Sequence, residues 1–444
     1  MESELKELNV AAAPPQPESD SRPLLKPESE KPVSSPSPST SIEELEKKYA
    51  PYVRFDVYGP MGRGDLPLVE KFLLGLALMF LFPVRVAAGT AIVVFYYLIC
   101  RFCTAFLAPN REDEQEDFAH MGGWRRAVIV RSGRFLSRVL LFVFGFYSIS
   151  DTSGGGEIDG AAITRFALKQ TKRSFPALLT GHADNVPGKR TSVSSLVVFV
   201  SADSNESEVL EEYGVIVSNH VSYLDILYHM SSSFPSFVAK RSVAKLPLIG
   251  LVSKCLGCVY VQRESKSSDF KGVSGVITER VQEAFQDNFA PKMLLFPEGT
   301  TTNGDYLLPF KSGAFLAKAP VVPVILRYPY QRFSPAWDSI SGVRHVILLL
   351  CQFVNYIEVK KLPVYHPSEQ EKEDPKLYAE NVRQLMALEG NLILSDIGLA
   401  EKRVYHAALN GLLCERQHYL EVIMESSDGS GHGHGAITCE ISFI

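Results

Sequence analysis

The chain has 444 residues, of which 46% are hydrophobic, and a formal net charge of −5 at pH 7. This length is sufficient for two or three domains. The acidic balance excludes the broad basic surface that nucleic-acid binding requires, so we expect no nucleic-acid partner. The average composition hides a strong division, because a polar N-terminal tail precedes a very apolar segment.

Residues 1–41 contain eight prolines and no aromatic residue. A segment of this composition cannot bury enough apolar area to offset its conformational entropy, so we predict a disordered tail. The tail also lacks the basic start and the apolar core of a secretory signal peptide. We therefore expect neither cleavage nor signal-directed export of the main domain.

Residues 42–150 are predicted to anchor the protein in a membrane. Two apolar runs of 13 and 15 residues occupy positions 72–100, on either side of Arg85. Each run is shorter than the ~20 residues that a spanning helix needs. Because Pro83 and Arg85 interrupt the apolar pattern, we expect a helical hairpin. A single kinked span is the alternative.

Basic residues lie on both sides of this apolar segment. They are Lys47, Lys48, Arg54, Arg63 and Lys71 before it, and Arg101, Arg111, Arg125, Arg126 and Arg131 after it. By the positive-inside rule both flanks are predicted to face the cytosol. These cations would meet anionic head groups, so membrane lipids are expected partners. A third apolar run, residues 139–149, predicts an interfacial helix, with a buried core helix as the alternative.

Seven cysteines include two CxxC pairs, one at Cys100 and Cys103 and the other at Cys255 and Cys258. The first pair ends the apolar segment and the second lies in a strand-like run. Neither has a histidine at the spacing of a zinc finger, so we expect no metal site and no disulfide. An odd number of cysteines is typical of reduced, buried thiols on the cytosolic side.

Residues 151–213 are polar and are predicted to form a mobile connector. Strand-like and helix-like segments then alternate, which predicts an α/β domain over residues 214–411, with a mostly buried sheet covered by helices. The expected strands are 214–218, 237–240, 258–262, 292–296, 321–328 and 345–354, and the expected helices lie near Ile226, Ala244 and Ala314, at 271–289 and within 375–398. A flexible tail, residues 412–444, follows.

His220 precedes Asp225 by five residues, and the sequence predicts a junction between a strand and a helix at this point. On a regular helix the two side chains would point about 140° apart, so they meet only if the chain bends between them. A carboxylate beside a histidine fixes the imidazole tautomer and stabilises the imidazolium. The alternative is a core histidine beside an aspartate that caps a helix.

Three further blocks follow His220 in order. They contribute Arg263 in LGCVYVQR, Glu298, Gly299 and Thr300 in FPEGT, the nearby Lys311, and Pro323 in a strand-like run. Singly, each block also fits a surface strand residue, a loop that ends a strand or a sheet edge. Together and in this order they resemble the motifs of the glycerolipid acyltransferase family. Over residues 43–410 the closest resemblance is to plant lysophospholipid acyltransferases of the lysophosphatidylethanolamine type.

The resemblance implies an α/β fold seated on the endoplasmic reticulum membrane by hydrophobic helices, with the catalytic domain facing the cytosol. It implies transfer of a fatty acyl group from acyl-CoA to the free glycerol hydroxyl of a lysophospholipid. His220 would then be the general base and Asp225 its orienting partner, with no acyl-enzyme required. Acyl-CoA is a co-substrate, and neither a metal nor another cofactor is implied.

The same resemblance assigns acceptor binding to the remaining motif residues. Arg263, Glu298, Gly299, Thr300, Lys311 and Pro323 would form this substrate-binding set. Thr301 departs from the pattern, because phosphatidate-forming relatives usually carry arginine there. A lysophosphatidate monoester has a charge of about −2 and a lysophosphatidylethanolamine diester about −1, so the missing cation favours the diester. Lysophosphatidate, glycerol-3-phosphate and a catalytically inactive lipid-binding scaffold are the alternatives.

Overall fold

The structure is a computed structural model. It describes residues 42–112, 115–119, 121–153, 213–261, 268–287 and 290–411. The predictions for the tails at residues 1–41 and 412–444, and for most of the connector, concern residues outside these ranges. Arg263 lies outside them as well.

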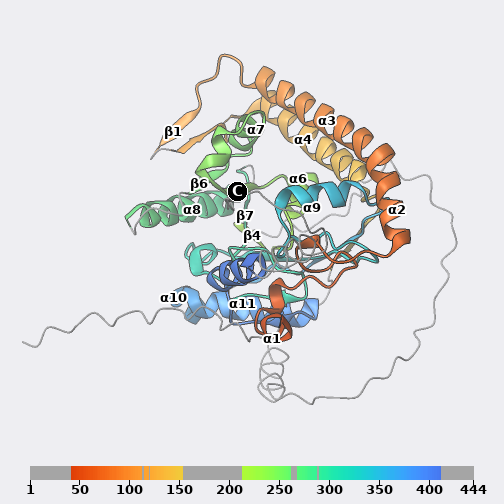
Figure 1. Ribbon diagram of the computed structural model, residues 1–444. Coiled ribbons are helices and arrows are strands. Elements are labelled where there is room, and N and C mark those ends of the chain that lie inside the picture. Colours follow the sequence, from red (N-terminus) through yellow and green to blue (C-terminus); the bar gives the residue numbers. More distant parts are fainter. Residues whose placement is uncertain are drawn as a thin grey trace, which may run out of the picture. The chain divides into compact units, whose positions relative to one another are not determined.

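A seven-stranded sheet forms the centre of the described chain, in the order β3-β10-β9-β4-β7-β5-β6. Figure 1 labels its strands β4, β6 and β7. The strands are β3 Ile149–Ser153, β4 Val215–Ser218, β5 Ser236–Lys240, β6 Val259–Val261, β7 Met293–Leu295, β9 Val321–Arg327 and β10 Ile357–Lys361. β4 pairs in parallel with β7 and β9, whereas β10 runs antiparallel to β9 and parallel to β3. The predicted α/β fold is confirmed.

Helices cover both faces of this sheet, as the alternation of buried side chains along β4 requires. Ile216 packs into one hydrophobic cluster, while Val215 and Val217 pack into another. On the Ile216 side lie α3 Phe82–Cys103, α4 Gly123–Val143, α6 Leu224–Ser232, α7 Ile249–Cys255 and α9 Gly342–Leu350; on the other lie α8 Ser268–Gln286 and α11 Pro375–Gly390. The sheet is therefore buried on both sides.

The apolar N-terminal segment is one unbroken helical run. It comprises α2 Leu68–Leu76, a π-helical segment Ala77–Leu81 and α3. Among the described helices, Leu68–Cys103 is the one that is long and apolar enough to cross a membrane. The hairpin bend predicted at Pro83 is wrong and the continuous alternative agrees with the structure. The π-helical segment immediately before Pro83 accommodates the proline ring and its missing N–H donor.

Three other element predictions also change. The strand predicted at residues 345–354 is wrong, because residues 345–350 belong to α9 and residues 351–354 follow it. A short apolar run does not by itself distinguish a strand from a helix. The interfacial helix predicted at 139–149 is wrong, since α4 ends at Val143 and Ile149 begins β3. The helices expected near Ala244 and Ala314 are short 3-10 turns, η4 Arg241–Lys245 and η5 Ser312–Ala314.

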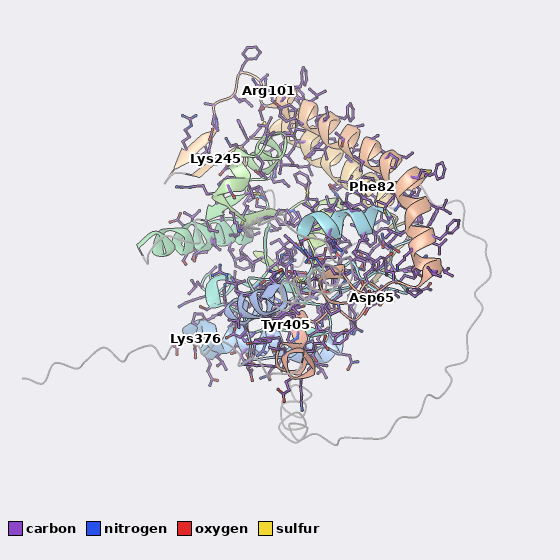
Figure 2. All side chains as sticks on the ribbon, in the orientation of Figure 1. Asp65, Phe82, Arg101, Lys245, Lys376 and Tyr405 are labelled. Atoms are coloured by element: carbon purple, nitrogen blue, oxygen red, sulfur yellow. The ribbon has the colours of Figure 1, made fainter. Side chains whose placement is uncertain are left out.

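The region before the apolar helix packs on the α/β unit. Residues from α1 Ile42–Lys48 to Met61 form a third hydrophobic cluster with a helix at 399–411. Tyr405 of this helix is labelled in Figure 2. Its ring centroid lies 5.4 Å from that of Tyr49. The α/β unit is thus larger than the predicted residues 214–411, because it also takes in this segment and β3.

Short elements complete the described chain. They are η1 Ala50–Tyr52, η2 Pro60–Gly62, β1 Asn110–Glu112, β2 Gln115–Asp117, β8 Tyr306–Leu307, α10 Glu369–Glu373 and β11 Ile393–Leu394. The five cysteines of the described part are buried free thiols.

Candidate active site

The site is built on the bend between β4 and α6. β4 ends at Ser218 and α6 begins at Leu224, so His220 follows the carboxyl end of a central strand. The Asn219 side chain fixes the start of the bend, because its amide donates to the Leu326 carbonyl at 3.0 Å and accepts from the Leu326 N–H at 2.8 Å. In open α/β sheets ligands bind at such strand ends.

The bend brings His220 and Asp225 together. The His220 Nδ1 atom lies 2.9 Å from Asp225 Oδ2. Asp225 is fully buried, and its Oδ2 atom also accepts from the N–H groups of Val221 at 2.8 Å and Ser222 at 3.0 Å. Its Oδ1 atom accepts from the Tyr328 hydroxyl at 2.6 Å. Asp225 therefore both shapes the bend and contacts the imidazole.

This arrangement defines the chemistry available to His220. A carboxylate accepts hydrogen bonds, so Nδ1 carries the ring proton and Nε2 carries the lone pair. No residue in the described ranges forms a hydrogen bond to Nε2, and 20% of the His220 side chain is exposed. Nε2 is therefore the atom that can accept a proton from a substrate.

The FPEGT loop holds His220 from the opposite side. The Phe296 ring stacks on the imidazole with centroids 4.0 Å apart. The His220 N–H donates to Glu298 Oε1 at 2.7 Å, and the His220 carbonyl accepts from the Thr302 N–H at 3.0 Å. The ring face and both backbone groups of His220 are thus fixed by this loop.

Glu298 lies behind His220, although the family resemblance assigned it to acceptor binding. The side chain is buried, and its second oxygen accepts from the Leu308 N–H at 3.0 Å. Burial favours the neutral acid, whereas the two backbone N–H donors favour the carboxylate. The effect of burial is the larger one, and it raises the pKa of Glu298 to about 8. Because both oxygens bind the protein's own backbone, Glu298 positions His220.

Gly299 and Lys311 meet on the outer part of the loop. Gly299 has a φ of +71°, which favours glycine, and a Cβ atom there would overlap the Lys311 ammonium. Lys311 is exposed and Thr300 is half-buried. The structure therefore brings these three predicted residues together beside the loop that holds His220.

Pro323 has a position within the sheet. It lies in β9 opposite Val217 of β4, so the alternative of a sheet edge is wrong. Its carbonyl accepts from the Leu362 N–H at 3.0 Å, one residue beyond the end of β10. The missing N–H of the proline consequently falls where the β10 ladder ends, which explains how an interior strand tolerates it.

Thr301 is turned into the protein, contrary to the expectation that this position faces the acceptor phosphate. Its side chain is buried and its hydroxyl bonds the Trp337 carbonyl. Lys402, in the helix at 399–411, donates to the carbonyl and the hydroxyl oxygen of Thr301, each at 2.8 Å, and to the Trp337 carbonyl at 3.2 Å. Burial lowers the pKa of Lys402 to about 8. Nothing in the local sequence pattern distinguished this lysine from a surface residue.

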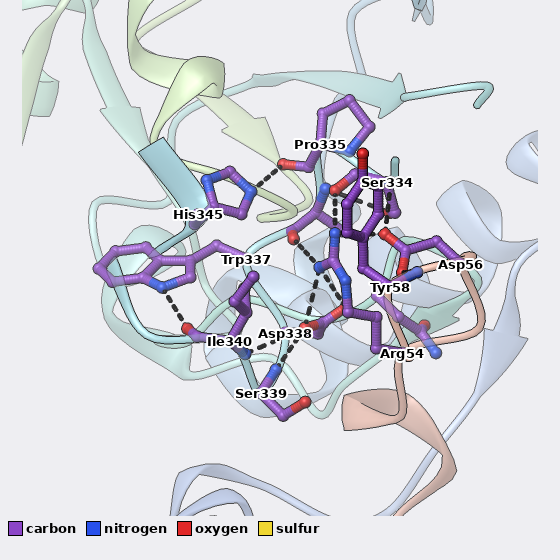
Figure 3. A network of polar contacts seen from close by, with 12 residues as sticks. Arg54, Asp56, Tyr58, Ser334, Pro335, Trp337, Asp338, Ser339, Ile340 and His345 are labelled. Atoms are coloured by element: carbon purple, nitrogen blue, oxygen red, sulfur yellow. Dashed lines mark hydrogen bonds and ion pairs between the residues drawn. The ribbon is translucent and has the colours of Figure 1, made fainter. Parts of the chain in front are cut away.

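Arg54 fixes a second loop beside the site (Figure 3). Its guanidinium is buried and forms ion pairs with Asp56 at 2.5 Å and Asp338 at 3.1 Å, and it donates to the Ser334 carbonyl at 2.7 Å. From this loop the Trp337 N–H donates to the carbonyl of Val221, the neighbour of His220, at 2.8 Å. Arg54 is thus a structural cation of the site's surroundings, whereas the sequence placed it among the basic residues flanking the membrane segment.

Comparison with known proteins agrees with these features. The family model described as Acyltransferase matches residues 198–327. The protein named lysophospholipid acyltransferase LPEAT1, from Arabidopsis thaliana, is 56% identical over 434 residues, which cover 94% of this chain and 99% of that protein. Lysophospholipid acyltransferase LPEAT2 of the same plant is 33% identical over 46% of this chain and 37% of its own.

A human relative matches over a shorter region. Lysophosphatidylcholine acyltransferase 1 from Homo sapiens is 39% identical over 171 residues, which cover 38% of this chain and 31% of that protein. The near full-length match to the first plant protein and the ordered motifs around His220 lead to one conclusion: the chain belongs to the glycerolipid acyltransferase family, among its lysophospholipid acyltransferases.

Proposed function

We propose that the protein transfers a fatty acyl group from acyl-CoA to the free glycerol hydroxyl of a lysophospholipid, with lysophosphatidylethanolamine as the preferred acceptor. The observation that carries this proposal is the state of His220. Its Nδ1 atom is committed to the buried Asp225, and its Nε2 atom, at the end of a central strand, has no hydrogen-bond partner among the residues that the structure describes. The names of the plant relatives support the acceptor class.

In the proposed reaction, Nε2 of His220 takes the proton of the acceptor hydroxyl. The oxygen forms a bond to the thioester carbon, the carbon–sulfur bond breaks, and the leaving CoA thiolate takes the proton from the imidazolium. Asp225 stabilises the imidazolium in between, without itself accepting the proton. The substrate hydroxyl takes the place of an enzyme serine, so the reaction needs no acyl-enzyme, metal or further cofactor.

The outer part of the FPEGT loop is the proposed site for the acceptor phosphate. Lys311 lies over Gly299 there and provides a cation, and a glycine allows a ligand to approach the loop backbone closely. The family resemblance adds Arg263 as a bidentate phosphate ligand. Glu298 contributes indirectly, by holding the backbone of His220.

The proposed location is the endoplasmic reticulum membrane, with the catalytic domain in the cytosol, where acyl-CoA is available. The apolar helix Leu68–Cys103 supports membrane attachment. Membrane lipids would surround its exposed side, which carries the large apolar side chains Phe72, Met79, Phe80, Val84, Phe95 and Phe102.

The test is an acyl-transfer assay on membranes containing the full chain, with labelled acyl-CoA and a panel of lysophospholipids, lysophosphatidate and glycerol-3-phosphate. We expect transfer to lysophosphatidylethanolamine, and a loss of about 10²- to 10⁴-fold in kcat for His220→Ala, because the general base is removed. His366→Ala, at an exposed histidine, is the matched control and should retain activity. Wild-type activity in His220→Ala refutes the mechanism. If the unmodified protein binds lipid but transfers an acyl group to none of the acceptors, it is a catalytically inactive lipid-binding scaffold instead.

A further inference from the structure

Residues 342–357 carry an apolar surface that the described chain leaves uncovered. The exposed fractions are 66% for Val343, 38% for Val346, 66% for Phe353, 45% for Val354 and 43% for Tyr356. The segment contains a single charged residue, an arginine at position 344, whose guanidinium bonds a backbone carbonyl. We call these five side chains the α9 surface.

The pattern of α9 is unusual for a helix that faces water. Its inner side is ordinary, because His345, Leu348 and Leu349 are buried in the core. A surface helix normally carries polar residues on its outer side. Here the outer positions include Val343 and Val346, so α9 carries apolar residues both on the side that faces the core and on the side that faces outward. An apolar medium on the outer side accounts for this composition.

Arg85 connects the α9 surface to the apolar helix Leu68–Cys103. It lies halfway along that helix, is buried, and donates to the carbonyls of Leu350 and Phe353, each at 3.1 Å. These carbonyls belong to the end of α9 and the residues after it, and α9 also contacts α3 (Figure 1). The carboxyl end of α9 is therefore fixed at the middle of the apolar helix.

The apolar helix contacts the α/β unit at its start, at its middle and at its end. Glu70 near its start forms an ion pair with Arg332, and Cys103 at its end is buried in the same cluster as Cys255 of α7. Its 36 residues extend over about 54 Å at ~1.5 Å per residue, against a hydrocarbon core of ~30 Å. A helix that is held at both ends and in the middle lies along the α/β unit. Segments attached to its middle therefore lie at the same depth in the membrane as the helix itself.

A cleft lies between the apolar helix and the α9 surface. Its volume is about 220 Å³, and it is lined by Leu73 and Leu74 of α2, by residues 351–356, and by Tyr58 and residues 329–333. The exposed side chains of the apolar helix and those of the α9 surface are therefore parts of one region. Continuity with the apolar helix identifies lipid acyl chains as the occupant, since one medium must cover both.

We propose that the α9 surface is a second lipid-contacting element, which inserts into the leaflet that holds helix Leu68–Cys103. The inference rests on the membrane location given under the proposed function. The N-terminal helix attaches the protein, and the α9 surface then fixes how the α/β unit sits on the lipid.

Tryptophan fluorescence in vesicles made with brominated phospholipids tests this proposal on the full chain. Val346→Trp reports on the α9 surface. Leu377→Trp, on α11 at the opposite face of the sheet, is the matched control, because Leu377 and Val346 are both 38% exposed. Phe95→Trp, at a position 56% exposed on α3, reports on the apolar helix itself. Subtracting the wild-type spectrum isolates each added tryptophan.

We expect the Val346→Trp emission to be blue-shifted and quenched by the brominated lipids, as for Phe95→Trp, and the Leu377→Trp emission to be quenched by aqueous iodide instead. Quenching of Phe95→Trp without quenching of Val346→Trp overturns the α9 proposal and leaves the anchor intact. Absence of quenching at both positions overturns the proposal together with the membrane location. The acyl-transfer activity of the same protein is measured separately, so the proposed reaction is tested independently of this result.

Discussion

At the scale of single residues, the surroundings of His220 assign different tasks to its two ring nitrogens. Nδ1 is held by Asp225, which accepts three further hydrogen bonds from the bend and from Tyr328. Four donors fill the buried carboxylate, so its orientation is fixed before a substrate binds. The imidazole is in turn held flat by Phe296. This preorganisation leaves Nε2 as the one ring atom directed to chemistry.

Asp225→Asn separates the orienting role from a purely structural role in the bend. The alternative of a helix cap is excluded by position, because the N-cap of α6 is Tyr223 and Asp225 accepts from the N–H groups of Val221 and Ser222 before the helix. The amide oxygen of asparagine can still accept from these N–H groups, so a structural role alone predicts little change in activity. An orienting carboxylate predicts a fall in kcat of up to about 10⁴-fold, because the amide favours the wrong imidazole tautomer. Asp374→Asn, at the N-cap of α11, is the control and should keep its activity. Near wild-type kcat in Asp225→Asn, measured alongside the unfolding midpoint, would leave Asp225 with only its structural role in the bend.

Glu298→Gln tests the buried carboxyl behind His220. The amide nitrogen cannot accept from one of the two backbone N–H groups, so we expect a loss of roughly 1–3 kcal/mol in unfolding free energy, together with a lower kcat. The KM for acyl-CoA should change little, because Glu298 contacts the backbone of His220 and Leu308. A large change in the acceptor KM at constant kcat would instead return Glu298 to acceptor binding.

The stability contributed by Glu298 should also depend on pH. Its pKa is about 8 in the folded protein and 4.5 in the reference state, so between these values the unfolded chain releases a proton that the folded protein retains. The contribution is complete below pH 4.5 and is lost as the pH rises towards 8. The difference in unfolding midpoint between the wild type and Glu298→Gln should therefore shrink from pH 5 to pH 8. A difference that grows with pH contradicts the raised pKa.

At the scale of elements, the site is held by segments that are distant along the chain. The FPEGT loop binds both backbone groups of His220, and the helix at 399–411 binds that loop through Lys402. The Lys402 ammonium donates hydrogen bonds to oxygens of Thr301 and Trp337. It also lies 5.5 Å from the centroid of the Tyr52 ring. The C-terminal helix is therefore part of the catalytic scaffold.

Thr301→Arg distinguishes this scaffold from the role in head-group selection that the sequence indicated. An arginine at this buried position would meet the Lys402 ammonium, and overpacking alone costs roughly 1–3 kcal/mol. We expect a lower unfolding midpoint and partial recovery in the double variant Thr301→Arg, Lys402→Met, which removes the like charge. Thr300→Arg, at the half-buried neighbour, should be tolerated. A stable Thr301→Arg that gains lysophosphatidate activity would restore the head-group explanation.

At the scale of the whole molecule, one side of the apolar helix packs into the core while the rest of it is exposed. Tyr96, Cys100 and Cys103 of α3 are buried in the main hydrophobic cluster, and Arg85 is buried against the residues after α9. The sequence separated an anchor from a catalytic domain, whereas the structure joins them. Removal of residues 72–100 should consequently release the protein from the membrane or misfold it, which membrane fractionation and the unfolding midpoint would show.

Protease protection in sealed microsomes tests the orientation. If both flanks of the apolar helix face the cytosol, added protease should cut the N-terminal tail and the catalytic domain alike. Deletion of residues 1–41 should preserve acyl transfer and membrane attachment, and an epitope at the new N-terminus should remain accessible. Protection of either the tail or the domain would show that the helix crosses the bilayer.

The sequence alone was sufficient for the α/β class, five of the sheet strands, the family and the pair of His220 with Asp225. These features depend on local patterns of hydrophobicity and on motifs within a few residues, which a linear chain displays directly. The tertiary structure decided what depends on distant partners: Arg54 and Asp338 are 284 residues apart in the chain, and Lys402 and Thr301 are 101 apart. A lysine that binds loop carbonyls, such as Lys402, has the same local sequence signature as a lysine on the surface. The apolar run of α9 likewise fits a strand as well as a helix. Only the packing around them determines which they become.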